Sequence, residues 1–162
     1  MFYRSDADAP RYWVFQQIFN FRFPPTESSN DMAFIECVDQ PGTGPALHTH
    51  VSEETFYVLE GSVCFSYWSE EEQKVISFTG GPGSVAHIDS GVPHGYKNVG
   101  DSPSRLVAAL TDASNIVNFF MKFAVEGKES DPVPEAPTSE EFAAFAAEAE
   151  AHGIIPFTVP KV

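Results

Sequence analysis

Short apolar segments separated by glycine and proline constrain the fold of this chain more than any other feature of its sequence. Turn-forming residues follow nearly every segment, as at 80–83, where the chain reads Gly-Gly-Pro-Gly. Many short strands with such turns between them are typical of a β-sandwich or a β-barrel. We therefore expect an all-β fold. The expected strands cover residues 13–23, 32–38, 55–60, 62–68, 74–79, 84–88, 94–98 and 105–111.

The C-terminal part of the chain has a different character. Residues 118–123 are apolar and fit either a strand or one helical turn, whereas 126–137 carry prolines among polar residues and are typical of a linker or surface segment. Thr138 and Glu141 then match a capping box, and apolar residues follow at helical spacing, which predicts an amphipathic helix. Gly153 is suited to end this helix. Because so short a helix is marginal alone, we expect it to dock on the rest of the protein.

Composition and charge exclude several classes of partner. The chain has 162 residues, the length of one domain, with 23 acidic against 9 basic side chains and a formal net charge of −14. Nucleic acids and anionic membranes both select basic surfaces, so we expect neither as a partner. No signal peptide is evident and no apolar run approaches membrane-spanning length, which predicts a soluble, cytoplasmic protein. Cys37 and Cys64 lie in apolar runs and are expected to be buried free thiols.

One stretch combines the residue types that bind transition metals. His48, His50 and Glu54 lie within seven residues and share the same parity. Residues two apart in an extended chain point to the same side, so we expect one strand to aim all three side chains at one point. Imidazole and carboxylate together suit a divalent transition metal. Glu53 has the opposite parity and is expected to be exposed to solvent.

This stretch and a second one resemble the two motifs of the cupin superfamily. The first motif reads glycine, five residues, His-x-His, three residues, Glu, six residues and glycine, and it is filled by Gly42, His48, His50, Glu54 and Gly61. The second reads glycine, five residues, Pro-x-Gly, two residues, His, three residues and Asn, and it is filled by Gly83, Gly91, His94 and Asn98. Asp89 stands where the second motif usually has proline, a departure that concerns the loop geometry and not the ligands. The resemblance covers residues 32–111.

The resemblance implies a jelly-roll β-barrel with a C-terminal α-helix and a metal site inside the barrel. By this analogy His48, His50, Glu54 and His94 bind one divalent transition metal. Fe, Mn, Ni, Co, Cu and Zn all remain open, since affinity order alone does not select a metal in cells.

The longer layout is similar to small single-domain cupins of the quercetin 2,3-dioxygenase-like group. We expect residues 1–125 to form the cupin barrel with an N-terminal strand. Residues 126–162 are then a Pro- and Glu-rich linker and a helix that packs on the barrel. Small cupins commonly pair through sheet edges, and the long apolar strand at 13–23 suits that role, which predicts a homodimer.

The resemblance implies a metal-dependent dioxygenase that acts on a small-molecule substrate, either an enol or hydroxy-ketone or a flavonol-like aromatic. Glu54 is then the catalytic residue and takes the proton of the substrate hydroxyl as general base. Two alternatives stay open: a metal-assisted isomerase, cyclase or decarboxylase that uses no oxygen, and a non-enzymatic small-molecule-binding cupin. His87 occupies no ligand position and is expected to be a packed or hydrogen-bonded side chain near the barrel, with pocket lining as the less favoured alternative. Aromatic residues on the expected strands belong to the core or line a pocket, namely Phe56, Phe65, Tyr67, Phe78 and Tyr96.

Overall fold

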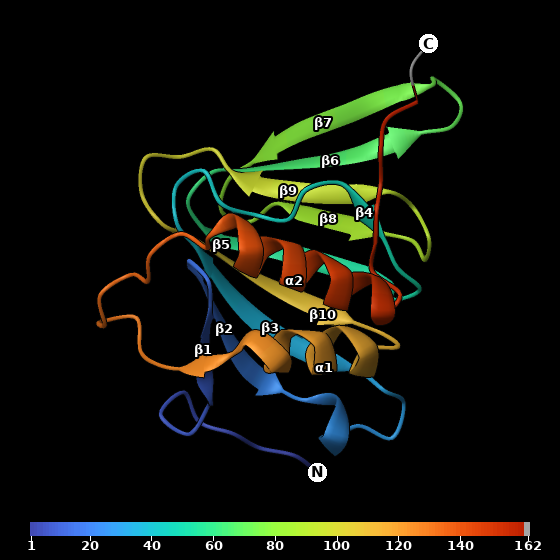
Figure 1. Ribbon diagram of the computed structural model, residues 1–162. Helices are drawn as coiled ribbons and strands as arrows, with labels where there is room; N and C mark the ends of the chain where they lie inside the picture. The colour runs from blue at the N-terminus through green and yellow to red at the C-terminus, as the bar shows by residue number, and fades with distance from the viewer. Residues whose placement is uncertain (161–162) are drawn as a thin grey trace.

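A computed structural model describes residues 1–160 as two antiparallel β-sheets with two short α-helices (Figure 1). The larger sheet contains β1 (Arg11–Val14), β2 (Gln17–Phe23), β3 (Ala33–Asp39), β5 (Glu54–Glu60), β8 (Val85–Ile88), β10 (Ser104–Leu110) and β11 (Val125–Glu126). The smaller sheet contains β4 (His48–Thr49), β6 (Val63–Ser69), β7 (Lys74–Gly80), β9 (His94–Asn98) and β12 (Ile155–Pro156). A 3₁₀ turn, η1 (Pro25–Glu27), and helices α1 (Ser114–Phe123) and α2 (Ser139–Ala151) complete the fold.

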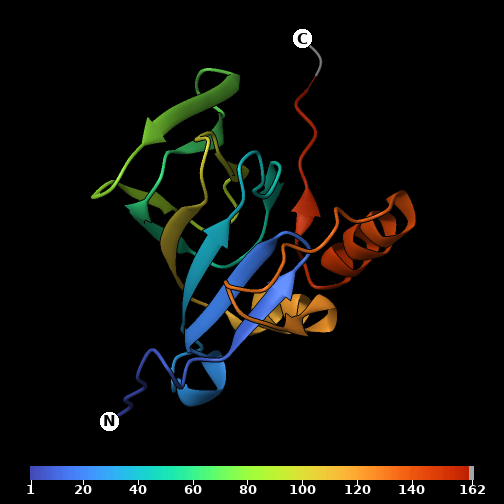
Figure 2. The ribbon, with the colours of Figure 1, turned by 90° about the vertical axis from the view of Figure 1, so that its left-hand side faces the viewer.

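The strand order is β11-β1-β2-β3-β10-β5-β8 in the larger sheet and β12-β4-β9-β6-β7 in the smaller one. Figure 2 shows the β6–β7 hairpin on one side of the molecule and helix α2 with the C-terminal segment on the other. Within residues 1–160, no strand of one sheet pairs with a strand of the other. The pairing therefore gives two sheets with β7 and β8 as edge strands, rather than a closed barrel of hydrogen-bonded strands.

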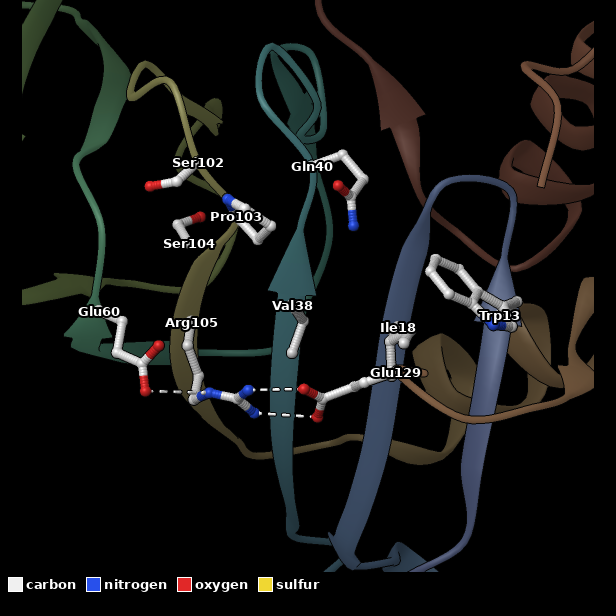
Figure 3. A pocket seen from close by; sticks show the side chains of 10 residues that line it. All are labelled: Trp13, Ile18, Val38, Gln40, Glu60, Ser102, Pro103, Ser104, Arg105 and Glu129. Atoms are coloured by element: carbon white, nitrogen blue, oxygen red, sulfur yellow. Dashed lines mark hydrogen bonds and ion pairs between the residues drawn. The ribbon is translucent and has the colours of Figure 1, made fainter. Parts of the chain in front are cut away.

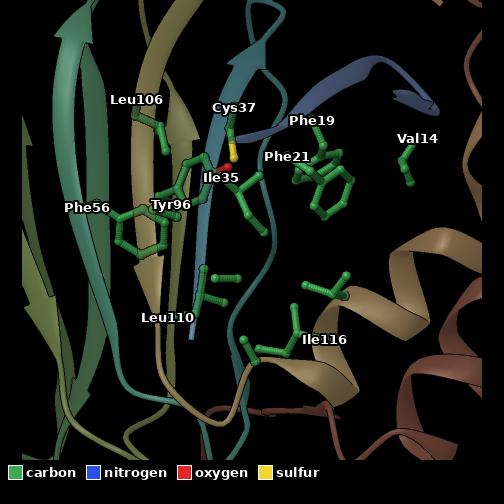
Figure 4. Packing of buried hydrophobic residues seen from close by; sticks show 14 of the residues in the cluster. Val14, Phe19, Phe21, Ile35, Cys37, Phe56, Tyr96, Leu106, Leu110 and Ile116 are labelled. Carbon is green, nitrogen blue, oxygen red and sulfur yellow. The ribbon is translucent and has the colours of Figure 1, made fainter. Parts of the chain in front are cut away.

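The inner faces of the sheets enclose the main hydrophobic core (Figure 4). Ile35 and Cys37 on β3 are 2% and 3% exposed, and Glu36 between them points to the outer face of the sheet. This alternation follows from the period of two in a strand. Phe56 of the larger sheet meets Tyr96 of the smaller sheet edge-on, with ring centroids 5.3 Å apart. Such contacts hold the two sheets against each other and fix the strands that carry the histidines.

The strands expected between residues 32 and 111 are all present, with ends within one residue of the prediction. The single strand expected at 13–23 is wrong, because the chain folds there into the β1–β2 hairpin. Phe15 stands in the turn with φ of 53°, and its ring lies 5.0 Å from that of Phe145 on α2. The apolar pattern continues through the turn because Phe15 is itself needed to pack against the helix.

The β1–β2 hairpin leaves no free strand at residues 13–23 through which two copies of the chain could pair. Strand β2 is paired on both sides, by β1 and β3, and the other side of β1 is paired by β11. Neither strand therefore offers a free edge to a second copy of the chain. The homodimer itself stays a prediction.

The segment at 118–123, open between strand and helix, is the second half of α1. Phe120 of this helix stacks on Phe19 of β2 with centroids 4.6 Å apart. The Thr138–Glu141 capping box is formed at the start of α2. Two residues of the segment predicted at 126–162, namely 161 and 162, lie outside the described residues.

The structure also describes the two cysteines and the length of the helices. Cys37 and Cys64 are free, the first buried and the second half-buried, and burial raises the pKa of the Cys37 thiol well above its ordinary value. In the described part of the chain, neither helix is long and apolar enough to cross a membrane.

Candidate metal centre

Three histidines from the two motifs meet at one point. His48 on β4 is the direct cross-strand partner of His94 on β9, and His50 follows β4 by one residue. One ring nitrogen from each histidine lies within 4.8 Å of the other two. His50 and His94 are only 6% and 3% exposed, so the cluster lies inside the protein.

Backbone carbonyls set the tautomer of each ring. The Nδ1 contacts are His48 to Ala46 at 2.9 Å, His50 to Ser52 at 3.0 Å and His94 to Val92 at 2.8 Å. A carbonyl oxygen can only accept, so in all three cases Nδ1 carries the proton and donates it. This arrangement leaves Nε2 as the ligand atom and fixes the orientation of the ring, as in many metal-binding histidines.

Glu54 reaches the cluster from the other sheet. Its Oε2 lies 3.1 Å from Nε2 of His94, and its Oε1 lies 3.7 Å from Nε2 of His50. The expectation of one strand carrying all three residues of the first motif is wrong: the chain bends at Val51, and Glu54 begins β5 of the larger sheet. The side chains converge because the chain crosses between the sheets, not because they share a strand face.

Burial keeps two of the imidazoles neutral. Loss of water, together with the nearby His94, lowers the pKa of His48 to about 4, and burial also lowers the pKa of His50. Burial acts in the same direction on His94, but the hydrogen bond and the charge of Glu54 outweigh it and raise the pKa of His94. Neutral imidazole is the form that binds metals, so His48 and His50 are preset as ligands at neutral pH.

A buried nitrogen of His50, unpaired within the described residues, indicates that a metal fits this set of donors. Nε2 of His50 is buried and has no hydrogen-bond partner among residues 1–160. An unpaired buried polar atom costs about 1–3 kcal/mol, which a bound cation would relieve. Three imidazole nitrogens and one carboxylate suit the first-row transition metals and zinc, whereas Mg²⁺ and Ca²⁺ prefer oxygen ligands. The three histidines could therefore hold one such metal through Nε2.

Glycines allow the two motifs to lie in contact. A Cβ on Gly95 would lie 2.6 Å from the carbonyl oxygen of Pro45, and one on Gly44 would lie 2.2 Å from that of Tyr96. In addition, the N–H of Gly91 donates to the carbonyl oxygen of His50 at 2.9 Å. Side chains at Gly44 or Gly95 would therefore separate the loop before His48 from β9.

Three further polar residues of the two motif segments, Glu53, Asn98 and His87, lie outside the histidine cluster. Glu53 is exposed, and Asn98 is fully buried with its side chain bonded only to backbone atoms. His87 is hydrogen-bonded, since its Nδ1 lies 2.8 Å from Oγ1 of Thr55, and it also lines the cavity beside the cluster, which is the less favoured alternative. Its Nε2 lies 3.4 Å from Oδ1 of Asp89, the residue that replaces the usual proline of the second motif.

A cavity of about 520 Å³ adjoins the histidine cluster. His94 forms part of its wall, together with residues of the edge strands β7 and β8. Tyr67 and Phe78 stack nearly parallel in this wall, with an interplanar angle of 15° and centroids 6.4 Å apart. Four of the five aromatic candidates line the cavity, namely Phe56, Phe65, Tyr67 and Phe78. Flat apolar walls beside a cluster of polar ligands are typical of small-molecule sites.

A smaller cavity of about 380 Å³ lies on the outer face of the larger sheet (Figure 3). Arg105 crosses it and forms two hydrogen bonds with the carboxylate of Glu129, at 3.1 and 2.7 Å. The same arginine pairs with Glu36, which alternates with the inward-facing residues of β3. The sheet therefore separates this cavity from the histidines, and its arginine, Arg105, is paired with carboxylates of the protein.

Comparison with known proteins agrees with this geometry. The family model described as "Cupin domain" matches residues 35–110, which include both motifs. No curated protein sequence matches the chain significantly.

Solved structures share the fold at low sequence identity. The polyketide cyclase RemF from Streptomyces resistomycificus matches with a TM-score of 0.57 and 18% identity, over 87% of this chain and 89% of RemF. An RmlC-like cupin from Shewanella frigidimarina NCIMB 400 matches with a TM-score of 0.57 and 12% identity, over 70% of this chain and 92% of that one. Recombinant oxalate oxidase in complex with glycolate matches with a TM-score of 0.52 and 17% identity, over 61% of this chain and 52% of the oxidase. The chain therefore contains a segment, residues 35–110, that is similar to the cupin domain model, and it shares its fold with these solved structures.

Proposed function

We propose that this protein is a metal-dependent dioxygenase of the quercetin 2,3-dioxygenase-like kind, with a flat enol, hydroxy-ketone or flavonol-like aromatic as its substrate. The proposal rests on the position of His94, which belongs to the histidine cluster and also lines the aromatic cavity. A planar molecule of suitable length in the cavity would place one polar end at the ligands. The proposal includes a jelly-roll arrangement of the two sheets around this site.

The chain's own residues have separate roles. His48, His50 and His94 hold the metal through Nε2, and the carbonyls that accept from Nδ1 keep the rings in place. The aromatic walls orient the substrate by stacking and exclude water. A divalent metal in this position would supply polarisation of the substrate oxygens and, when redox-active, electron transfer toward dioxygen. Both atoms of dioxygen enter the product, so the reaction needs no external reductant.

Glu54 is the proposed general base. It is 8% exposed and, within residues 1–160, no lysine or arginine forms an ion pair with it. A carboxylate without a permanent cation can accept the proton of an acidic substrate hydroxyl, which leaves the substrate as its electron-rich anion. Removal of this proton is the step that prepares the substrate for oxygen.

A non-oxidative cyclase or isomerase is the second candidate. It is favoured by the similarity to the polyketide cyclase RemF, which extends over 87% of the chain. The same four residues would serve, with the metal as a Lewis acid and Glu54 as the base that forms an enolate. The two candidates differ in whether oxygen is consumed.

Oxygen uptake separates the candidates. Metal-free protein is reconstituted in turn with Fe²⁺, Mn²⁺, Co²⁺, Ni²⁺, Cu²⁺ and Zn²⁺, and flavonols and 1,3-diketones are supplied in an oxygen electrode. We expect oxygen uptake in step with substrate loss, reduced about 100-fold or more in Glu54→Gln and unchanged in the exposed neighbour control Glu53→Gln. Substrate conversion that persists without oxygen would contradict the dioxygenase and select the second candidate. Binding without conversion under either condition would select a non-enzymatic cupin.

A further inference from the structure

Strand β4, which carries His48, is weakly held on one side. It contains two residues, and one residue pair, His48 with His94, joins it to β9. A segment with so few sheet contacts opens easily unless other contacts restrain it. The position of His48 therefore depends on what lies on the other side of β4.

The end of the chain lies there. Residues 153–157, which we call the C-terminal strap, leave helix α2 and pass along β4 (Figure 1). The N–H of Phe157 donates to the carbonyl oxygen of Leu47 at 2.9 Å. The remaining residue pairs between the strap and β4 are Ile155 with Thr49 and Pro156 with His48. The strap thus contributes more pairing to β4 than β9 does.

The register places a proline beside the ligand. Because Phe157 and Leu47 share a ladder hydrogen bond, the next pair, Pro156 with His48, is a non-hydrogen-bonded pair. Side chains approach most closely in such pairs, and the backbone N–H groups there point away from the partner strand. Pro156 lacks an N–H and so removes no hydrogen bond from the ladder. Its ring therefore lies on the same face of the sheet as the His48 imidazole.

Both ends of the strap are anchored. Ile154 is buried in the core, and its N–H donates to a carbonyl oxygen in the last turn of α2 at 2.9 Å. At the other end, the ring of Phe157 lies 5.6 Å from that of Trp68, which is 3% exposed. The backbone N–H of Trp68 donates to the carbonyl oxygen of Pro93 at 2.8 Å, and Pro93 directly precedes His94 in the chain. Trp68 therefore contacts both the strap and the segment that carries a second ligand.

We propose that the C-terminal strap is a positioning element of the metal centre, acting through His48. It holds β4 so that Nε2 of His48 is directed at the same point as Nε2 of His50 and His94. The inference rests on the metal centre of the proposed function, and it adds a part of the chain that lies outside both motifs. Metal affinity depends on such supporting contacts, because a histidine that is free to move is less often oriented correctly for binding the metal.

Zinc affinity of full-length variants tests the strap. Phe157→Pro removes both the N–H that bonds to Leu47 and the ring that contacts Trp68. Val159→Pro, an equal change at an exposed position two residues on, is the matched control. The Kd of metal-free protein for Zn²⁺ is measured by competition with a chromophoric chelator, and circular dichroism follows the fold. We expect Zn²⁺ binding to weaken roughly 10- to 100-fold in Phe157→Pro and to stay unchanged in the control.

A double-mutant cycle distinguishes positioning of His48 from a general structural role. In a His48→Ala background, Phe157→Pro should weaken Zn²⁺ binding by less than about twofold, because the ligand that it positions is already absent. An equal loss in both backgrounds would overturn the proposal, as would an unchanged Kd in folded Phe157→Pro. Should Phe157→Pro fail to fold, Phe157→Ala removes only the ring; the proposal then requires a smaller loss that also vanishes with His48→Ala.

The outcomes remain distinguishable from those of the oxygen experiment. A strap effect on Zn²⁺ affinity without oxygen consumption would remove the dioxygenase and keep the positioning role. A wild-type protein that binds none of Fe²⁺, Mn²⁺, Co²⁺, Ni²⁺, Cu²⁺ and Zn²⁺ would overturn the metal centre and the strap together.

Discussion

Two buried glutamates on opposite faces of the larger sheet have opposite surroundings. Glu36 on the outer face is 7% exposed, and Glu54 on the inner face is 8% exposed. Glu36 pairs with Arg22 at 2.5 Å and also with Arg105. Among residues 1–160, Glu54 has ion-pair contacts only with the imidazoles of His50 and His94. The two side chains are thus buried to nearly the same extent. They differ in whether an arginine, which always carries a positive charge, is paired with the carboxylate.

This difference separates an ion-paired cluster around Glu36 from the histidine cluster around Glu54, which is the candidate binding site. The carboxylate of Glu36 is paired with two arginines within the protein, and the buried Oδ1 of Asn20 beside it has no partner in the described residues. The Glu54 cluster keeps a buried nitrogen of His50 without a partner in the described residues and directs three Nε2 atoms at one point. A group of polar atoms that stays incomplete inside a protein is a candidate for binding something else.

Loss of a ligand should have the largest effect. His94→Ala removes one of the three imidazoles and the partner of Glu54, so we expect the affinity for Zn²⁺ to fall by more than about 100-fold. The fold should persist, because the two sheets are held by the apolar core and not by His94. Calorimetric Zn²⁺ titration and a thermal melt of the metal-free protein measure the two properties separately. Unchanged Zn²⁺ affinity would show that the ligands are assigned wrongly.

The reverse pattern is expected for Glu36→Ala. This change leaves Arg22 and Arg105 without their buried partner, and breaking a buried ion pair of this kind costs about 3–5 kcal/mol. Urea denaturation should show that loss, while Zn²⁺ affinity stays at the wild-type value. A large drop in Zn²⁺ affinity with little loss of stability would contradict the division between the two clusters.

Asp39 is a third buried carboxylate and belongs to neither cluster. Burial raises its pKa to about 7, although hydrogen bonds from Gln17 and Tyr96 act in the opposite direction. Because this value lies above that of the unfolded chain, the stability it contributes is present at about pH 4 and is lost as the pH rises toward 7. Asp39→Asn does not titrate, so the free energies of unfolding of the two proteins should diverge by roughly 4 kcal/mol between about pH 4 and 8. Parallel urea-denaturation profiles for both proteins would contradict the raised pKa.

Glu129→Ala should have the smallest effect. Glu129 holds Arg105 from the segment after β11, but its side chain is 37% exposed, and partly exposed ion pairs contribute less than about 1 kcal/mol. Chemical denaturation should show a change of that size or less, with no change in Zn²⁺ affinity. A loss as large as that of Glu36→Ala would place Glu129 inside the buried cluster.

The strands and the members of the histidine cluster could be predicted from local pattern. The resemblance to the second cupin motif is what adds His94 to the group. Period-two alternation and glycine-rich turns identify strands such as β3 and β6, and the His-x-His spacing identifies His48 and His50. These signals are local, because each is carried by residues close together in sequence.

Features that depend on distant partners could not be predicted in this way. Phe15 stands in a turn because it packs on Phe145 of α2, and the apolar alternation continues through it unchanged. Glu54 was expected to share a strand with His48, but the bend at Val51 moves it to the other sheet. The pairing of β12 with β4 has no local signature, since Ile155 and Pro156 form a strand only against β4.

Metal content decides whether the histidine cluster binds a transition metal. Elemental analysis of the purified chain, after incubation with each of the six divalent metals and removal of excess ion, should find close to one transition metal per chain in the wild type. It should also find one per chain in Glu36→Ala and almost none in His48→Ala or His94→Ala. A wild-type protein without bound metal under all six conditions, or histidine variants that retain it, would contradict the metal centre described for this chain.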